Sequence, residues 1–358
     1  VVHTNLGRAP FSNDIINETA EVLKGYNNLE FDLTTGKRLT RYYHVTEILK
    51  FLTGAEDILV VNNNAAAVMM ILRSFAKDRE VIVSRGEQIE IGGSFRLPDI
   101  MTASDCRMVE VGTTNKTRIQ DYENAITNDT ALLFKAHQSN YVIKGFTQEA
   151  SLQELVHTGK MHKIPVVYDM GSGLLRKTSV KVLEGEPDVK QTLDSGVDLV
   201  SFSGDKLLGA SQAGIIAGKK DLIDSLKKEP MLRALRVGKT TLALLESALR
   251  YYLDDETLIS KNEVFRTLTT ELEVLKKRAL LLQKALGKEN IESVVIANQG
   301  FCGGGALPME DIESYAVRLN PEHNTNKERS RFAEKVYYKL MVHSLPVVGL
   351  LKKGNIDF

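Results

Sequence analysis

Lys206 occupies a position where burial of its charged side chain would cost free energy. Lys206 lies in the stretch VSFSGDKLLGASQAGI, directly after an apolar run and among small residues. A buried ammonium loses hydration, so it must find a partner or release its proton. A lysine that is partly neutral can form a Schiff base with a carbonyl compound. Asp169 ends another apolar run, IPVVYD, where a carboxylate can be held rigidly. The two residues together indicate a cofactor site.

The chemistry that needs such a pair is that of pyridoxal phosphate, which requires an acidic partner on its pyridinium nitrogen. Its phosphate requires a helix N-terminus and hydroxyl groups. Asn63, Asn64 and Ala65 open a helix directly after a strand, and Ser203 lies three residues before Lys206. Taken singly, each residue has a simpler interpretation: the aspartate as a helix cap, the asparagines as turn formers and the lysine as a surface residue. Taken together, they predict a pyridoxal phosphate site.

The elements that position these residues alternate between apolar runs and helical patterns. Apolar runs without polar alternation are typical of strands buried on both faces, which predicts an α/β fold with a mostly parallel sheet. Polar residues follow five of these runs, at the strand ends where such sheets bind ligands. The runs are DILVVNN, EVIVSRG, CRMVEVG, TALLFKAH, IPVVYDMGSG, VDLVSFSGDK and AGIIAG.

A second, smaller domain is predicted after the sheet. Apolar residues recur at three- and four-residue steps from Phe265 to Leu286, which predicts one amphipathic helix. Strand patterns follow, and HSLPVVGLLKKGNIDF predicts a hairpin. We therefore expect a large domain over residues 1–235, with an N-terminal arm over residues 1–12, and an α+β domain over residues 236–358.

Composition excludes several classes of protein. The 358 residues contain 46 Lys plus Arg and 46 Asp plus Glu, so an RNA partner would have to use a local patch. The two cysteines, Cys106 and Cys302, lack metal-ligand spacing, and no metal site is predicted. No apolar run is long enough to span a membrane, and the start lacks a signal peptide, so we expect a cytoplasmic protein without a membrane partner.

Several motifs resemble one family of enzymes. They are VVHTNLGRAPFS, NNLEFDLTTGKR, VNNNAAAV, SRGEQIEIGGSFRLPDIM, EVGTTNKT, SNYVIKGF, YDMGSG and SFSGDKLLGASQAGII. Together they resemble bacterial L-seryl-tRNA(Sec) selenium transferases over nearly the whole chain. The resemblance implies fold type I of the pyridoxal phosphate enzymes, the aspartate aminotransferase-like fold, with Lys206 as the Schiff-base lysine.

The resemblance also implies a reaction. Serine esterified to tRNA(Sec) loses its β-hydroxyl to leave an aminoacrylate, and selenium from selenophosphate adds to give selenocysteinyl-tRNA(Sec). Because the ester removes the charge of the carboxylate, arginines in the pocket are free for another anion. Arg8, and Arg233 and Arg236 three apart on one helical face, match the family's oxyanion site, although each could be a solvated arginine. His137 is a candidate to stack on the cofactor ring or to be a structural residue.

The implied partners are seryl-tRNA(Sec), selenophosphate and further copies of the chain, since the family forms rings of dimers such as decamers. Lys219, Lys220, Lys227 and Lys228 are candidates for an RNA patch or for a solvated helix face. The start without methionine and the final GNIDF predict that both natural ends are missing, including the family's small N-terminal tRNA-binding domain.

Two alternatives remain at this point. The first is a pyridoxal phosphate lyase that acts on a free small amino acid, because paralogous families share the same core. The second is a catalytically idle fragment that binds RNA or oxyanions, or serves as an oligomerisation scaffold.

Overall fold

The computed structural model describes residues 6–91, 95–301, 311–319, 325–352 and 354–358. These residues form two compact units, a larger one that runs to Leu268 and a smaller one that begins at Thr269. The boundary between the compact units falls after Leu268, and the domain boundary expected after residue 235 stays a prediction. No helix of the described residues is long and apolar enough to cross a membrane.

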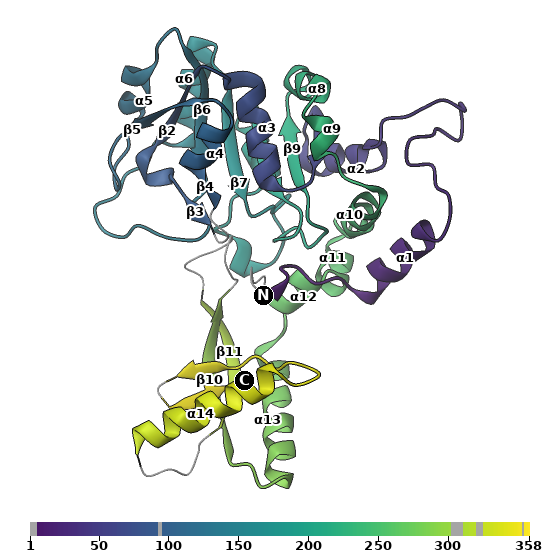
Figure 1. Ribbon diagram of the computed structural model, residues 1–358, viewed down its shortest axis with the longest axis vertical. Helices are drawn as coiled ribbons and strands as arrows, with labels where there is room; N and C mark the ends of the chain where they lie inside the picture. The colour runs from purple at the N-terminus through teal and green to yellow at the C-terminus, as the bar shows by residue number, and fades with distance from the viewer. Residues whose placement is uncertain (1–5, 92–94, 302–310, 320–324, 353) are drawn as a thin grey trace. The chain divides into compact units, whose positions relative to one another are not determined.

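The larger unit is built on a seven-stranded sheet (Figure 1). The strand order is β1-β9-β8-β7-β6-β2-β5, and β9 alone runs antiparallel to its neighbours. All seven predicted apolar runs form these strands, so the prediction of a mostly parallel α/β sheet is confirmed. The strands are β1 (Asp57–Val61), β2 (Glu80–Ser84), β5 (Arg107–Val111), β6 (Thr130–Ala136), β7 (Val166–Gly171), β8 (Leu199–Ser203) and β9 (Gly214–Gly218).

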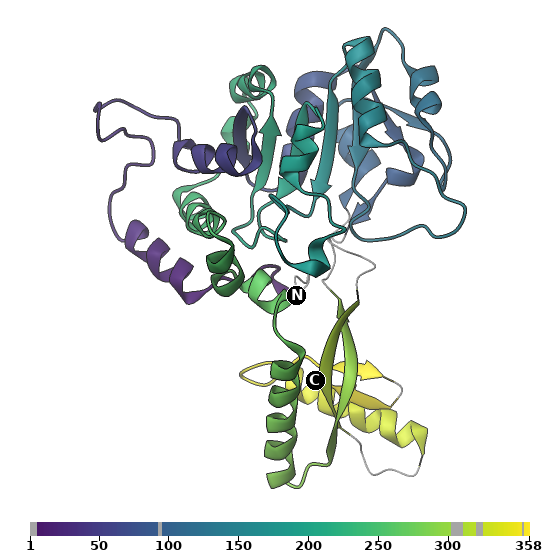
Figure 2. The ribbon, with the colours of Figure 1, turned by 180° about the vertical axis from the view of Figure 1, so that it is seen from behind.

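Helices cover both faces of this sheet (Figures 1 and 2). On one face α3 packs across β6, β8 and β9 and contacts α4 and α8 (Figure 1). On the other face α2 contacts α7, and α6 contacts α5, β6 and β7 (Figure 2). The helices of the unit are α1 (Asn13–Leu23), α2 (Tyr43–Thr53), α3 (Asn64–Ala76), α4 (Leu97–Ala103), α5 (Ile119–Ala125), α6 (Leu152–His162), α7 (Val189–Asp194), α8 (Lys220–Lys228), α9 (Leu232–Leu235), α10 (Lys239–Tyr251), α11 (Asp255–Lys261) and α12 (Glu263–Leu268). Two 3₁₀ turns, η2 (Arg85–Glu87) and η3 (Lys181–Leu183), and the short strands β3 (Glu90–Ile91) and β4 (Phe95–Arg96) complete it.

In its described residues, the smaller unit is an antiparallel sheet with two helices. Its strand order is β10-β11-β13-β12, and its core contains Leu319, Ala333 and Ile356. The predicted C-terminal hairpin is confirmed by the pairing of β12 with β13. The elements are α13 (Leu272–Lys288), β10 (Ser293–Phe301), β11 (Asp311–Leu319), α14 (Asn326–Met341), β12 (Leu350–Lys352) and β13 (Asn355–Asp357).

The prediction of one helix from Phe265 to Leu286 is wrong. The structure has two helices, α12 and α13, with Thr269 and Thr270 between them. Phe265 is fully buried in the larger unit, where its ring meets Tyr252, whereas α13 packs on β10 and β11. Two β-branched threonines favour a break, and the two apolar stripes happened to be in phase across it.

Candidate functional site

Lys206 lies in a tight turn that is fixed to the structure around it. The turn follows β8, and its backbone is held by hydrogen bonds from Leu207 N–H to Ser172 O, 2.9 Å, and from Gly209 N–H to Lys206 O, 3.0 Å. Gly204 passes so close to the chain that a Cβ atom there would lie 2.5 Å from the Ser211 carbonyl oxygen. The turn therefore presents the lysine from a rigid backbone.

The Lys206 side chain is 7% exposed, yet no described residue forms a hydrogen bond or ion pair with its ammonium. Its nitrogen lies at the end of β7, where a Cβ atom on Gly171 would be 3.6 Å from it. Burial lowers the pKa of Lys206, the Asp169 carboxylate opposes this, and the Arg8 guanidinium lowers the pKa further. The amine is thus available in its neutral, nucleophilic form more readily than an ordinary lysine.

Asp169 is held in one orientation beneath this turn. It is 3% exposed on β7, and its Oδ1 accepts hydrogen bonds from Asn64 Nδ2 at 2.7 Å and from Ser201 Oγ at 3.1 Å. Burial raises the pKa of Asp169, while the Asn64 hydrogen bond and the Lys206 charge act in the opposite direction. The Asn64 amide and the Ser201 hydroxyl fix the carboxylate toward whatever occupies the pocket.

The N-terminus of α3 forms the third side of the site. Asn63 caps the helix by accepting a hydrogen bond from Ala66 N–H at 2.9 Å. The N–H groups of Asn64 and Ala65, at the first positions of α3, have no partner within the helix. An anion binds readily at such an end.

These residues line one pocket of about 170 Å³, which we call the Lys206 pocket. Seven of the ten predicted site residues meet there, and two lining residues, Phe95 and Gln212, were not predicted. The predicted members are Arg8, Asn63, Asn64, Ala65, Asp169, Ser203 and Lys206. Phe95 precedes α4 with no distinguishing pattern, whereas Gln212 belongs to the polar turn after the lysine.

Arg8 reaches the pocket from the N-terminal segment. Its guanidinium donates to both carboxylate oxygens of Asp205, at 2.9 and 3.1 Å, and Ala9 N–H donates to Asp205 O at 3.1 Å. Arg8 has a left-handed backbone conformation with φ of 65°. Asp205 was missed from the sequence, although its place directly before the lysine was a signal.

The other two predicted arginines line a different pocket. Arg233 and Arg236 border a cavity of about 570 Å³ with Arg38, Arg41 and Tyr42, which we call the arginine pocket. The prediction that they share one helical face is wrong, because α9 ends at Leu235 and Arg236 is extended. Arg236 pairs through its backbone with Val61 at the end of β1, so the arginine pocket adjoins the strand that leads into α3.

His137 is not among the residues that line the Lys206 pocket. Its N–H donates to Asp169 O at 2.8 Å, and its Nδ1 lies 3.9 Å from Glu186 Oε1. The backbone contact ties His137 to the strand that carries the aspartate, and stacking on a cofactor ring stays a prediction.

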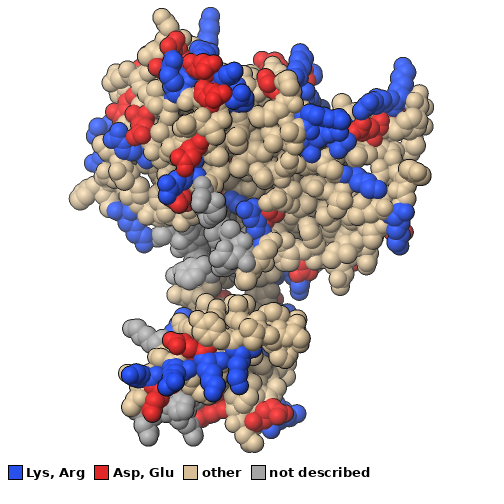
Figure 3. Space-filling model, viewed as in Figure 1, with Lys and Arg blue, Asp and Glu red and all other residues tan. Residues whose placement is uncertain are grey.

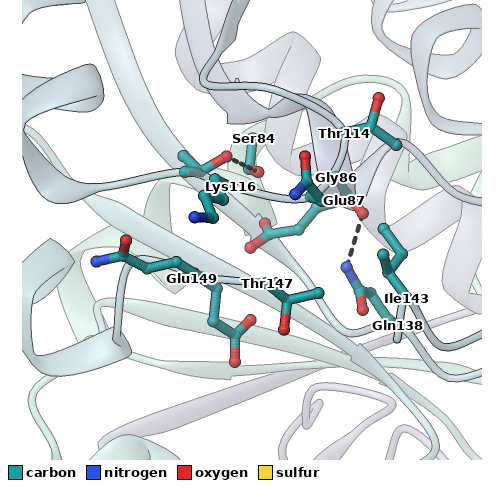
Figure 4. Close-up of a pocket in the computed structure, with 12 residues that line it drawn as sticks. Ser84, Gly86, Glu87, Thr114, Lys116, Gln138, Ile143, Thr147 and Glu149 are labelled. Atoms are coloured by element: carbon teal, nitrogen blue, oxygen red, sulfur yellow. Dashed lines mark hydrogen bonds between the residues drawn. The ribbon is translucent and has the colours of Figure 1, made fainter. Parts of the chain in front are cut away.

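A second buried lysine and carboxylate pair lies at the ends of β2 and β6. Lys135 Nζ donates to Glu87 Oε1 at 2.8 Å, to Ala150 O at 3.2 Å and to Glu149 Oε2 at 3.3 Å. Glu87 also accepts from Ala136 N–H at 3.0 Å. Glu87 and Glu149 line a polar pocket of about 370 Å³, where Gln138 donates to Gly86 O (Figure 4). Every bond of this ammonium is made within the protein.

Comparison with known proteins identifies the family. The family model for L-seryl-tRNA selenium transferase matches residues 1–358. The chain belongs to the L-seryl-tRNA selenium transferase family. A family relative, the L-seryl-tRNA(Sec) selenium transferase of Alkaliphilus oremlandii (strain OhILAs), is 49% identical over 99% of this chain and 75% of its own length. The enzyme of Clostridium botulinum (strain Loch Maree / Type A3) is 45% identical over 99% of this chain and 76% of its own length.

Solved structures confirm the predicted fold of this family member as fold type I. D-glucosaminate-6-phosphate ammonia-lyase has a TM-score of 0.68 at 20% identity and covers 99% of this chain and 87% of its own. A lysine-to-alanine variant of a serine palmitoyltransferase from S. paucimobilis, with a bound pyridoxal phosphate–myriocin aldimine, has a TM-score of 0.52 at 14% identity, over 97% and 79% of the two chains. An aspartate aminotransferase of Thermus thermophilus has a TM-score of 0.51 at 15% identity, over 97% and 84%.

The alternative functions are not favoured. The relatives at 45% to 49% identity are selenium transferases, whereas the ammonia-lyase shares 20% identity and a common fold. An idle scaffold gives no reason for a buried lysine that has no partner among the described residues.

Proposed function

We propose that the Lys206 pocket binds pyridoxal 5′-phosphate and converts L-seryl-tRNA(Sec) into L-selenocysteinyl-tRNA(Sec). The observation that carries this proposal is the buried Lys206 amine, which has no partner among the described residues and lies in the same pocket as the oriented carboxylate of Asp169. Bound pyridoxal phosphate supplies an electron sink for bonds broken at the serine Cα. Selenophosphate as donor, a homo-oligomer and a cytoplasmic location belong to the proposal on the strength of the family resemblance.

The described residues fit this cofactor. Lys206 is the amine that would hold its carbonyl carbon, and Asp169 is the acid that would pair with its ring nitrogen. The N–H groups of Asn64 and Ala65, which have no partner within α3, and the hydroxyl of Ser203 are the groups that would hold the phosphate. The buried Oδ1 atom of Asn64, which lines this pocket, has no hydrogen-bond partner among the described residues, as expected of a group that faces a ligand.

Lys206 also has the properties of a proton carrier. Its lowered pKa allows the free amine to remove the proton from the serine Cα. Hydroxide is a poor leaving group, so the β-hydroxyl must receive a proton as it departs, and the same nitrogen can return it. Asn64 and Ser201 keep Asp169 in place during both transfers.

We further propose that the arginine pocket takes the anionic selenium donor. In the part of the chain that the structure describes, the side chains of Arg233 and Arg236 have no ion-pair partner. The planar guanidinium group can donate two hydrogen bonds at once to two oxygens of a phosphate derivative. Arg8 lines the Lys206 pocket itself. The family resemblance implies active sites at subunit interfaces, where the arginine pocket of a second copy would lie beside the Lys206 pocket of the first.

Turnover tests this proposal directly. Seryl-tRNA(Sec) carrying labelled serine, with selenophosphate and pyridoxal phosphate, should yield labelled selenocysteine after ester hydrolysis, and free L-serine should yield none. Release of pyruvate from free serine without formation of selenocysteinyl-tRNA would assign the site to a lyase instead.

A further inference from the structure

Helix α14 carries four cations at four-residue spacing. They are Lys327, Arg331, Lys335 and Lys339, and all four are exposed. Figure 3 shows Lys and Arg side chains gathered in a band over this helix, in the lower part of the view. We call these four residues the α14 row.

The row lies opposite the buried face of its helix. Ala333 is 1% exposed in the core of the smaller unit, and Val336 and Tyr337 pack against that core. At 100° per residue the row covers an arc of about 120° centred opposite these residues, and it runs for about 18 Å along the axis. The row therefore faces away from the core that α14 helps to form.

The cations of the row are unpaired within the described chain. None of the four has a hydrogen bond or ion pair there, and the carboxylate of Glu328 is engaged by the helix cap Thr325 at 2.8 Å. Glu334 is exposed at the edge of the row. Three of the four lysines expected as an RNA patch behave differently, since Lys219, Lys220 and Lys227 pair with Asp198, Asp224 and Asp57.

An aromatic ring lies within the row. Tyr338 follows Lys335 by three residues and is 66% exposed, with its ring edge-on to Tyr337 at 5.5 Å between centroids. Cations that contact phosphates and a ring on which a base can stack are the combination found on surfaces that bind RNA. An acidic protein surface would use the cations but has no particular use for the ring.

We infer that the α14 row binds the phosphate backbone of the tRNA substrate. The inference rests on the proposed function, because seryl-tRNA is the polyanion that this enzyme must hold. A chain with 46 positive and 46 negative side chains can attract RNA only through local groups without internal partners, and the row is such a group.

The test is the salt dependence of tRNA binding to the full chain. Fluorescence anisotropy with a labelled tRNA(Sec) transcript should show that Arg331→Gln with Lys335→Gln weakens binding about tenfold at 0.1 M salt. The slope of log affinity against log salt should become shallower by roughly 1 for each phosphate that the variant no longer neutralises. The matched control is Lys277→Gln with Lys284→Gln on α13, which removes the same charge from exposed positions of the same unit and should leave both quantities close to the wild type.

Equal weakening by the two double variants would overturn the inference, because it would reflect total charge alone. Unchanged tRNA binding would also overturn it, and a changed oligomer mass in that case would assign the row to a protein contact. Tyr338→Ala should weaken binding while leaving the salt slope unchanged. Borohydride trapping of the cofactor in the same samples separates this inference from the proposed function: a normal adduct with unaltered tRNA binding rejects the row alone.

Discussion

Lys206 and Lys135 are two buried lysines of the same α/β unit, 7% and 8% exposed. Each is attracted electrostatically to a buried carboxylate, Asp169 for Lys206 and Glu87 for Lys135. Lys135 makes three hydrogen bonds within the protein, whereas Lys206 makes none with the described residues. Burial lowers the pKa of both, but attraction to Glu87 and Glu149 leaves the pKa of Lys135 raised, and Asp169 does not do the same for Lys206. A buried cation with its bonds made supports the fold, and one without them is available to a ligand.

The largest expected effect is a loss of catalysis when Lys206 is replaced. Lys206→Met should reduce selenocysteinyl-tRNA formation by at least about 10²–10⁴-fold, because it removes the amine that holds the cofactor and moves the proton. The variant should fold normally by circular dichroism, since no described residue depends on the ammonium as a partner. Residual turnover close to that of the wild type would remove Lys206 from the site.

Lys135→Met should reduce stability and leave turnover nearly unchanged, the reverse of Lys206→Met. Removing one partner of a buried pair leaves Glu87 uncompensated and should lower the free energy of unfolding by about 3–5 kcal/mol in urea denaturation. Turnover per folded molecule should remain near normal. Lys135→Met combined with Glu87→Met should recover part of this stability, and failure to recover any would mean that the pair itself was not the cause.

The same contrast applies to the arginines. Arg233 has no partner among the described residues, whereas Arg38 of the same pocket pairs with Glu30 at 2.7 Å. Arg233→Ala should raise the KM for selenophosphate by about tenfold, a charge-assisted contact of about 1.4 kcal/mol. Cofactor binding should not change, and Arg38→Ala is the control. An equal weakening of cofactor and donor binding would give the arginine a role in the fold or the cofactor site.

Much of this contrast could be predicted from sequence, and part of it could not. Apolar runs fix strands locally, so all seven strands of the sheet and the residues at their ends were predictable. The Glu87–Lys135 pair joins residues 48 apart, and no local pattern marks it. The Arg8–Asp205 contact spans 197 residues in the same way. The break at Thr269 could not be recognised from the sequence, because the apolar residues of α12 and α13 keep the same three- and four-residue spacing across it.

The smallest effect is a pH dependence that separates the two lysines. In the cofactor-free protein the folded pKa of Lys206 lies below its unfolded value, so the unfolded state binds more protons between the two and stability rises with pH. Lys206→Met should therefore exceed the wild type in stability at pH 7, with a gap that shrinks toward about pH 10. For Lys135, whose pKa is raised, the stabilisation persists below the unfolded pKa and is lost only as pH rises through the folded pKa. Its Met variant should show a constant deficit from pH 7 to about pH 10.

The most direct test is to add pyridoxal phosphate to the purified protein, reduce it with borohydride and map the modified peptide. The account predicts an absorbance band that reduction abolishes, with the cofactor attached to Lys206 in the peptide that contains SFSGDK. Attachment to Lys135, or no attachment to any lysine, would contradict the claim that the chemistry is performed by Lys206, the buried lysine that has no partner in the described part of the chain.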